Sequence, residues 1–348
     1  MKTLVKRIVQ IVIVFVLLEI FLQFYNPFRS RVKNGDVILP KHVKYELAEL
    51  NIKGLDSHLL HQKNNIGFRG SDWNDSIKLK KIIFMGGSTT ECFYLNDNKD
   101  WPSIFASKIN EKKTTYWVNN AGMDGQSSYG NLVMLKQHVL NLKPDYVILM
   151  TGLNDIGLKK PSKYDETDAK GWRYLYNKLE LPATIVNLIR ANKAKKLGFN
   201  HQVLDVEKAE KINLTDTQIV QRITNELPLI QSYKERIKEI AKLCKENNTK
   251  LIFISQTVLF GDENDMFTNA NLSDIKVGET NGKTLALLLK QYNKATYEVT
   301  EELGLKFVNL SLRLPKDSRF FYDGIHFTNE GSEMVASLIY DELENEFK

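Results

Sequence analysis

Residues 81–90 read KIIFMGGSTT, an apolar run followed by two glycines, a serine and two threonines. A short apolar run of this kind is typical of a buried strand. The glycines let the backbone turn sharply and leave the Ser88 hydroxyl exposed at the end of the strand. Such a hydroxyl can attack an acyl carbon if a base removes its proton. Taken alone, the turn fits a phosphate cradle or a plain tight turn at least as well.

Two common motifs are excluded at this turn. No Gly-Lys-Ser/Thr follows, so the segment is not a Walker loop. Thr90 stands where the Gly-x-Ser-x-Gly elbow of the α/β-hydrolases has its last glycine.

Outward from this turn, the chain alternates between strand-like and helix-like segments. The predicted strands are Lys81–Met85, Tyr116–Asn119, Tyr146–Met150, Leu251–Ser255 and Lys306–Asn309. Apolar residues at three- and four-residue spacing predict helices over Ile230–Asn247, Thr284–Leu303 and Asn329–Phe347. Strands separated by helices predict an α/β fold, a doubly wound, flavodoxin-like parallel sheet of about five strands with helices on both faces. Active sites of such sheets lie at the carboxyl ends of the strands.

Two stretches do not fit the alternation. Residues 29–80 read as a polar linker or N-terminal extension before a catalytic domain over 81–348. Residues 158–216 read as an insertion, a lid or binding subdomain or else a linker. Trp172, Tyr174 and Tyr176 favour an ordered insertion.

Three further polar segments follow predicted strands or precede the last helix. After the second strand comes a loop with Gly122 and Gly125, where a glycine N–H can approach a substrate oxygen closely; an ordinary strand-to-helix loop is an equal alternative. After the third strand, Thr151-Gly152-Leu153-Asn154-Asp155 carries an amide that donates two hydrogen bonds. The alternative role for Asn154 is a helix cap.

The last segment is Tyr322-Asp323-Gly324-Ile325-His326-Phe327-Thr328. A carboxylate three residues before an imidazole can accept its Nδ1–H, which leaves Nε2 free as a base. The alternative is a turn at Asp323-Gly324 beside a partly buried histidine, with Thr328 capping the last helix.

The four segments together resemble the SGNH (GDSL-like) hydrolase family over about residues 81–347, in a variant like its membrane-anchored, carbohydrate-linked members. The resemblance implies Ser88 as nucleophile and Asp323 and His326 as the rest of a triad. It implies an oxyanion hole made of Ser88, Gly125 and Asn154; Gly125 is preferred to Gly122 by its distance after the strand. Gly-Gly-Ser-Thr-Thr departs from the commoner Gly-Asp-Ser-x-Ser. Residues 64–70 also resemble a stretch that precedes the nucleophile, where Arg69 either touches the site or lies on the surface.

The basic excess of the chain is confined to its N-terminal part. Lys and Arg total 48 and Asp and Glu 42, a net charge of +6. Residues 1–44 contain eight basic and two acidic residues, so residues 45–348 are balanced at 40 against 40. A nucleic-acid-binding protein more usually shows its excess on the folded domain, and no nucleic-acid partner is expected.

The same N-terminal part contains an apolar segment from Ile8 to Phe28, interrupted by Glu19. Its length of about 20 residues is near that needed to cross a bilayer, and no small residues mark a cleavage site. We therefore expect residues 1–28 to form an uncleaved single-pass transmembrane helix, with an amphipathic or buried helix as the alternative. Basic residues on both sides leave the orientation open. An extracytoplasmic catalytic domain at the cell membrane is the predicted localisation.

Metal and cofactor chemistry has little support in the sequence. Cys92 and Cys244 fit no zinc spacing and read as buried or half-buried free thiols, with a disulfide as the alternative if the domain is exported. The histidines lack ligand spacing. No cofactor is implied. The sequence predicts a serine esterase or acyltransferase acting on O-acyl groups, O-acetyl above all, of cell-envelope glycans. The alternative is a non-catalytic, membrane-tethered binding or assembly protein on the same fold.

Overall fold

The computed structural model describes residues 2–26, 32–33, 36–48, 50–76, 78–111, 115–161, 165, 171, 178–185, 188–189 and 203–347. It divides into two compact units. One comprises residues 1–38 and 163–202, and the other comprises residues 39–162 and 203–348.

The larger unit is built on a six-stranded sheet. Helices alternate with its strands along the chain, which confirms the predicted α/β class. The strand order is β12-β9-β8-β6-β7-β5, and all neighbours are parallel except β5. The parallel strands follow the doubly wound order 2-1-3-4-5 in their sequence order. Their bounds are β6 (Lys80–Gly86), β7 (Tyr116–Asn120), β8 (Tyr146–Met150), β9 (Lys250–Ile254) and β12 (Lys306–Val308).

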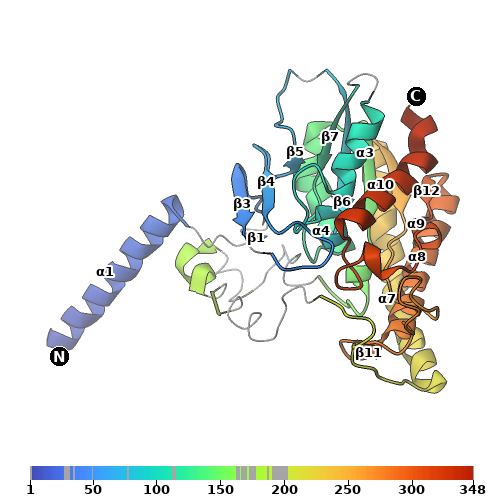
Figure 1. Ribbon diagram of the computed structural model, residues 1–348. Coiled ribbons are helices and arrows are strands. Elements are labelled where there is room, and N and C mark those ends of the chain that lie inside the picture. Colours follow the sequence, from blue (N-terminus) through green and yellow to red (C-terminus); the bar gives the residue numbers. More distant parts are fainter. Residues whose placement is uncertain are drawn as a thin grey trace. The chain divides into compact units, whose positions relative to one another are not determined.

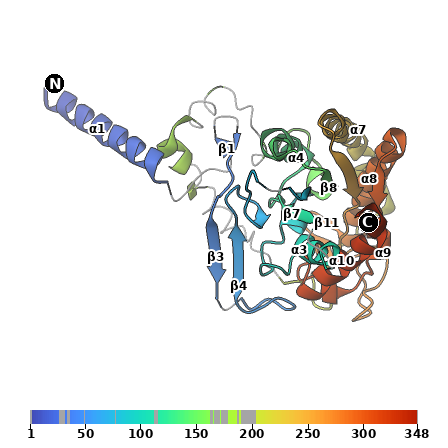
Figure 2. The ribbon, with the colours of Figure 1, turned by 90° about the horizontal axis from the view of Figure 1, so that it is seen from above.

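The strands carry apolar side chains on both faces of the sheet, and helices cover both faces and bury them. Figure 2 shows α3 and α10 on one side of the strands and α4 and α7 on the other. Phe84 of β6 packs edge-on against Trp101 and Phe105 of α3, while Tyr233 of α7 is wholly buried on the opposite side. The helices are α3 (Trp101–Ile109), α4 (Ser128–Met134), α7 (Asp216–Glu246), α8 (Gly282–Leu303), α9 (Leu310–Arg313) and α10 (Asn329–Leu343).

Helix α7 is longer than predicted. It begins at Asp216, behind a capping box formed by Thr215 and Gln218, and it continues through Pro228. The other predicted helices start within two residues of their expected positions, and Thr328 caps α10 through its side chain.

Residues 39–80, predicted as part of a polar extension, contain regular structure. β3 (Val43–Leu47) and β4 (Leu59–Lys63) pair as an antiparallel hairpin. β5 (Arg69–Gly70) joins the main sheet as an antiparallel edge strand against β7. Figure 1 shows this hairpin beside the sheet.

The smaller unit contains helix α1 (Lys2–Phe24) and the short strands β1 (Val32–Lys33) and β2 (Asp36–Val37). Within the described residues, no helix has both the length and the apolar character of a membrane span. The predicted transmembrane helix is therefore not supported. Lys6, Arg7 and Glu19 limit the longest uncharged run of α1 to residues 8–18, about half of the roughly 20 residues that a span needs. The predicted localisation stays a prediction.

Glu19 has a structural partner inside this unit. Its carboxylate accepts the backbone N–H groups of Glu180 and Leu181 at 2.7 and 2.8 Å. About half of the predicted insertion over 158–216, including Trp172, Tyr174 and Tyr176, lies outside the described residues.

The shorter elements connect these layers. They are α2 (Ser88–Glu91), η1 (Leu135–Val139), η2 (Leu140–Leu142), η3 (Leu153–Asp155), β10 (Lys276–Val277), β11 (Thr280–Asn281), η4 (Ser318–Phe320) and η5 (Glu344–Phe347).

Candidate active site

Ser88 begins the short helix α2 directly after β6. Its N–H lies in the first helical turn, where a helix offers no backbone acceptor. A Cβ on Gly87 would lie 2.5 Å from the Asn154 amide nitrogen and 3.2 Å from the Gln126 carbonyl oxygen. Gly87 is therefore required because two other chain segments approach the turn closely at this point.

His326 reaches Ser88 from the loop before α10. Its Nε2 lies 2.7 Å from the Ser88 Oγ, and its Nδ1 lies 2.7 Å from the Asp323 Oδ2. The other Asp323 oxygen accepts the backbone N–H groups of Ile325 and His326 at 3.0 and 2.8 Å. The carboxylate thus holds both the loop and the ring. With Nδ1–H donated to Asp323, Nε2 can accept the proton of Ser88.

The ring of Tyr322 lies along one face of the His326 imidazole, with centroids 5.7 Å apart and an interplanar angle of 17°. The alternative of a plain turn beside an uninvolved histidine does not explain this chain of three partners. The roles of Ser88, Asp323 and His326 in a reaction remain predictions, but their geometry is that of a nucleophile, a base and an orienting acid.

Asn154 lies in the 3₁₀ turn η3 after β8, and its amide nitrogen donates to the Gln126 carbonyl at 3.0 Å. This bond ties the Asn154 turn to the loop after β7. The described contacts of Asn154 include no backbone N–H accepted by its side chain, so they give no support to the helix-cap alternative. One of the two amide hydrogens is engaged by Gln126, which leaves the second for another acceptor.

Gly125 occupies the third position of the turn Met123–Gln126, which the Gln126 N–H closes on the Met123 carbonyl at 3.1 Å. Its φ of +65° is the conformation that favours glycine at this position. The N–H of the other loop glycine, Gly122, donates to the Asn120 side chain at 2.9 Å. The Gly122 N–H is thus already engaged, and the role of Gly125 as an oxyanion donor stays a prediction.

Asp155, the residue after Asn154, anchors the turn that carries Asn154. Its buried carboxylate accepts the Ser128 hydroxyl and N–H, and it pairs with Arg236 of α7 at 3.1 Å. Burial raises the pKa of Asp155, while the Ser128 hydrogen bonds and the Arg236 charge act in the opposite direction. The Arg236 Nε also donates to the Ser128 hydroxyl at 2.7 Å. This cluster anchors the loops after β7 and β8 to the same helix.

Arg69 is neither a surface residue nor one of the residues bonded to Ser88. It is buried, and it donates to the carbonyl oxygens of Glu91, Cys92 and Leu95 at 2.7–3.0 Å. Its guanidinium also pairs with Asp97 at 3.2 Å. Arg69 therefore supports the chain that leaves α2.

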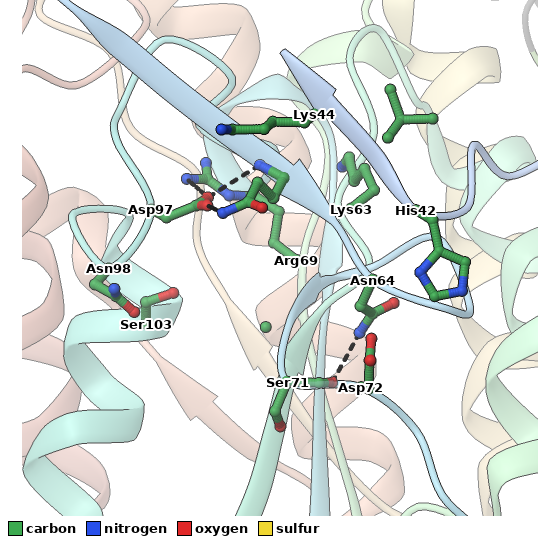
Figure 3. A pocket seen from close by; sticks show the side chains of 13 residues that line it. His42, Lys44, Lys63, Asn64, Arg69, Ser71, Asp72, Asp97, Asn98 and Ser103 are labelled. Atoms are coloured by element: carbon green, nitrogen blue, oxygen red, sulfur yellow. Dashed lines mark hydrogen bonds and ion pairs between the residues drawn. The ribbon is translucent and has the colours of Figure 1, made fainter. Parts of the chain in front are cut away.

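A polar cavity of about 480 Å³ lies between the β3–β4 hairpin and β5. Figure 3 shows the Arg69–Asp97 pair in its wall, with His42 and Lys44 on the β3 side and Lys63 on β4. The Lys63 Nζ pairs with Glu91 of α2 at 2.8 Å. The cavity is thus connected to the Ser88 helix by one buried ion pair.

Two contributors to the site have no signal in the sequence motifs. Gln256 follows β9 and bonds both to Thr89 and to the Leu153 N–H, and Glu91 accepts the Asp124 N–H. The only pattern that points to Gln256 is its place in a short polar run, Ser255-Gln256-Thr257, that follows a buried strand. Cys92 and Cys244 are free and buried, as predicted. Among the residues that the structure describes, no three His, Cys, Asp or Glu side chains are grouped as metal ligands.

Several solved structures have similar folds at low sequence identity. An acetylxylan esterase from Geobacillus stearothermophilus is 14% identical, covering 76% of this chain and 94% of its own, with a TM-score of 0.44. A GDSL-like lipase from Bacteroides thetaiotaomicron is 17% identical, covering 79% of this chain and 93% of its own, with a TM-score of 0.42. No curated protein matches the chain.

The model of the GDSL-like lipase/acylhydrolase family matches residues 84–334. That range begins inside β6, ends inside α10 and includes all five residues predicted for the site. It covers well over half of the chain. The chain therefore belongs to the GDSL-like lipase/acylhydrolase family and is an esterase, as the sequence predicts.

Proposed function

We propose that this esterase removes or transfers O-acyl groups, O-acetyl above all, on cell-envelope glycans, with Ser88 as its nucleophile. The observation that carries the proposal is the continuous set of hydrogen bonds from Ser88 through His326 to Asp323. The distances from Ser88 Oγ to His326 Nε2 and from His326 Nδ1 to Asp323 Oδ2 are both 2.7 Å. Such a set activates a serine hydroxyl toward an ester carbonyl.

In the first step, the Ser88 Oγ attacks the ester carbonyl carbon and its proton passes to the His326 Nε2. The carbonyl oxygen gains negative charge and accepts hydrogen bonds from the N–H groups of Ser88 and Gly125 and from the Asn154 amide. Collapse of this intermediate breaks the bond to the sugar oxygen, which takes the proton from His326. The acyl group remains on Ser88.

In the second step, water or a sugar hydroxyl attacks the acyl-enzyme while His326 accepts its proton. Water gives hydrolysis and a sugar hydroxyl gives transfer. The tetrahedral intermediate uses the same three donors, and its collapse returns the proton from His326 to Ser88. Asp323 stabilises the imidazolium in both steps.

The polar cavity between the β3–β4 hairpin and β5 is a candidate binding site for a sugar that carries the ester, although none of its lining residues comes from the Ser88, Asn154 or His326 segments. Its lining is dominated by amides, hydroxyls and charged groups, which match sugar hydroxyls better than alkyl chains. Lys63 and Glu91 connect this cavity to the helix that begins at Ser88.

A serine-reactive fluorophosphonate probe tests the nucleophile. We expect it to label the wild-type protein and Ser107→Ala, which removes a helix-surface hydroxyl, but not Ser88→Ala. Thermal unfolding of each variant checks that the fold is retained. Persistent labelling of Ser88→Ala, or no labelling of the folded wild type, would exclude Ser88 as the nucleophile.

Acetate release from acetylated glycans tests the substrate. Release by the wild type and its loss in Ser88→Ala would support the proposal. Cleavage of short aryl esters without any release or transfer from acetylated glycans would contradict the glycan substrate while leaving the esterase intact.

A further inference from the structure

Gln256 lies at the carboxyl end of the sheet, two residues after β9, and it is 3% exposed. The Asn293 amide of α8 holds its backbone on both sides: the Gln256 N–H donates to Asn293 at 3.0 Å, and the Gln256 carbonyl accepts from it at 2.8 Å. The backbone of Gln256 is therefore fixed by α8, and its side chain extends from that fixed point toward the site.

The Gln256 side-chain amide joins two segments that are far apart in the sequence. Its Nε2 donates to the Thr89 Oγ1 at 3.0 Å, and its Oε1 accepts the Leu153 N–H at 3.1 Å. Thr89 directly follows Ser88, and Leu153 directly precedes Asn154. One planar group thus sets the spacing between the nucleophile turn and the turn that carries the Asn154 amide.

From this geometry we propose that Gln256 is a positioning residue for the esterase reaction, which holds Asn154 in register with the Ser88 N–H so that both donors meet one substrate oxygen. The proposal rests on the proposed function of Ser88 and Asn154. Gln256 acts through these residues, and the substrate does not need to contact it.

The loop after β7 is tied to α2 in the same manner. Glu91, the last residue of α2, accepts the Asp124 N–H at 2.6 Å, and Asp124 directly precedes Gly125. Lys63 holds the other Glu91 oxygen at 2.8 Å. In both cases, a buried side chain connects α2 to the residue before an oxyanion donor. This repetition indicates that the spacing of the donors is fixed on both sides of Ser88.

The expected effect of losing the Gln256 bridge follows from the sensitivity of catalysis to geometry. A misplacement of about 1 Å at a reacting centre can cost on the order of 100-fold in rate. Donors of an oxyanion hole act mainly on the transition state, so the loss falls on kcat rather than on KM. We expect Gln256→Met, which keeps the side-chain length without its hydrogen bonds, to lower kcat about 10- to 100-fold with KM nearly unchanged.

The matched control is Thr257→Val. Thr257 is the next residue, it is equally buried, and its hydroxyl has no hydrogen-bond partner among the described residues. We expect this variant to keep kcat within about 2-fold. Thr89→Val removes one of the two hydrogen bonds of the Gln256 side chain and leaves Gln256 itself intact. Its kcat should therefore fall by less than that of Gln256→Met.

A double-mutant cycle with Asn154→Ala separates positioning from general destabilisation. If Gln256 acts through Asn154, Gln256→Met should lower kcat by less than about 3-fold in the Asn154→Ala background. A structural defect would instead lower kcat by the same factor in both backgrounds. Should Gln256→Met fail to fold, the same cycle is run with Thr89→Val.

Steady-state hydrolysis of a short-chain aryl ester measures all these variants. Normal kcat in Gln256→Met, or equal losses in the two backgrounds, overturns the positioning role. The fluorophosphonate result keeps the two proposals distinguishable. If labelling depends on Ser88 but Gln256→Met has a normal kcat, only the positioning role is rejected. If labelling does not depend on Ser88, the proposed function itself is rejected.

Discussion

Replacing Asn154 by alanine separates a catalytic from a structural role for this residue. The Asn154 side-chain amide donates one hydrogen bond to the Gln126 carbonyl oxygen, at 3.0 Å. The substitution therefore removes one intramolecular hydrogen bond and, in the proposed mechanism, one donor to the oxyanion. These two losses have different magnitudes and appear in different measurements.

The loss in turnover is expected to be large. Removal of one oxyanion donor typically lowers kcat on the order of 10²–10³-fold, or about 2.7–4 kcal/mol of transition-state stabilisation. The loss in stability is expected to be small. One partly buried hydrogen bond contributes about 0.5–1.5 kcal/mol, which corresponds to a fall in Tm of roughly 1–6 °C for a domain of this size.

The assay is steady-state hydrolysis of a short-chain aryl ester, where acylation limits the rate, alongside thermal unfolding. Asn131→Ala is the matched control, because Asn131 is a buried asparagine whose side chain bonds to Thr151 at 3.3 Å. We expect Asn131→Ala to lower Tm while kcat stays within a few-fold. An Asn154→Ala protein that turns over within about 3-fold of the wild type would refute the oxyanion role, whatever its Tm.

Two further predictions concern stability. Arg236→Met should lower the free energy of unfolding by about 3–5 kcal/mol in denaturant titrations, since it leaves the buried Asp155 carboxylate without its 3.1 Å partner; a loss below about 1 kcal/mol would show that Asp155 needs no charge partner. His61 is wholly buried, and burial followed by the charges of Arg69 and Lys63 lowers its pKa to about 2. Below about pH 6.5, His61 therefore binds a proton in the unfolded chain but not in the folded protein. The contribution of His61 to the free energy of unfolding is thus fully present above about pH 6.5 and is lost as the pH falls. Between pH 6.5 and 4.5 the wild type should lose about 2–3 kcal/mol more than His61→Phe, and parallel pH profiles of the two proteins would contradict this.

The parts of the fold that could be predicted are those with an uninterrupted local signal. The five parallel strands are continuous apolar runs because both faces of the sheet are covered, and each lies within a residue or two of its predicted bounds. The start of α7 was missed by 14 residues, since Pro228 and a largely exposed first half conceal it. The capping box of Thr215 and Gln218 was the available signal.

The supporting residues of the site could not be predicted, because their roles depend on distant partners. Gln256 is defined by contacts with Thr89 and Leu153, and Glu91 by contacts with Lys63 and Asp124. None of these pairs has a characteristic spacing. The two-residue strand β5 is likewise too short for a periodic pattern and is recognised only by its pairing with β7.

The topology of the sheet gives a reason for the position of the site that does not depend on the identity of its residues. β6 lies between β7 and β8 in the sheet, so the order of the strands reverses there. At such a point the connections after neighbouring strands leave toward opposite faces and open a crevice at their carboxyl ends. Ser88 follows β6, Gly125 follows β7 and Asn154 follows β8, so the three predicted oxyanion donors come from the strands on the two sides of this reversal. The order of the strands therefore determines where the site lies, and the motifs at the ends of these strands supply the groups that the proposed mechanism uses.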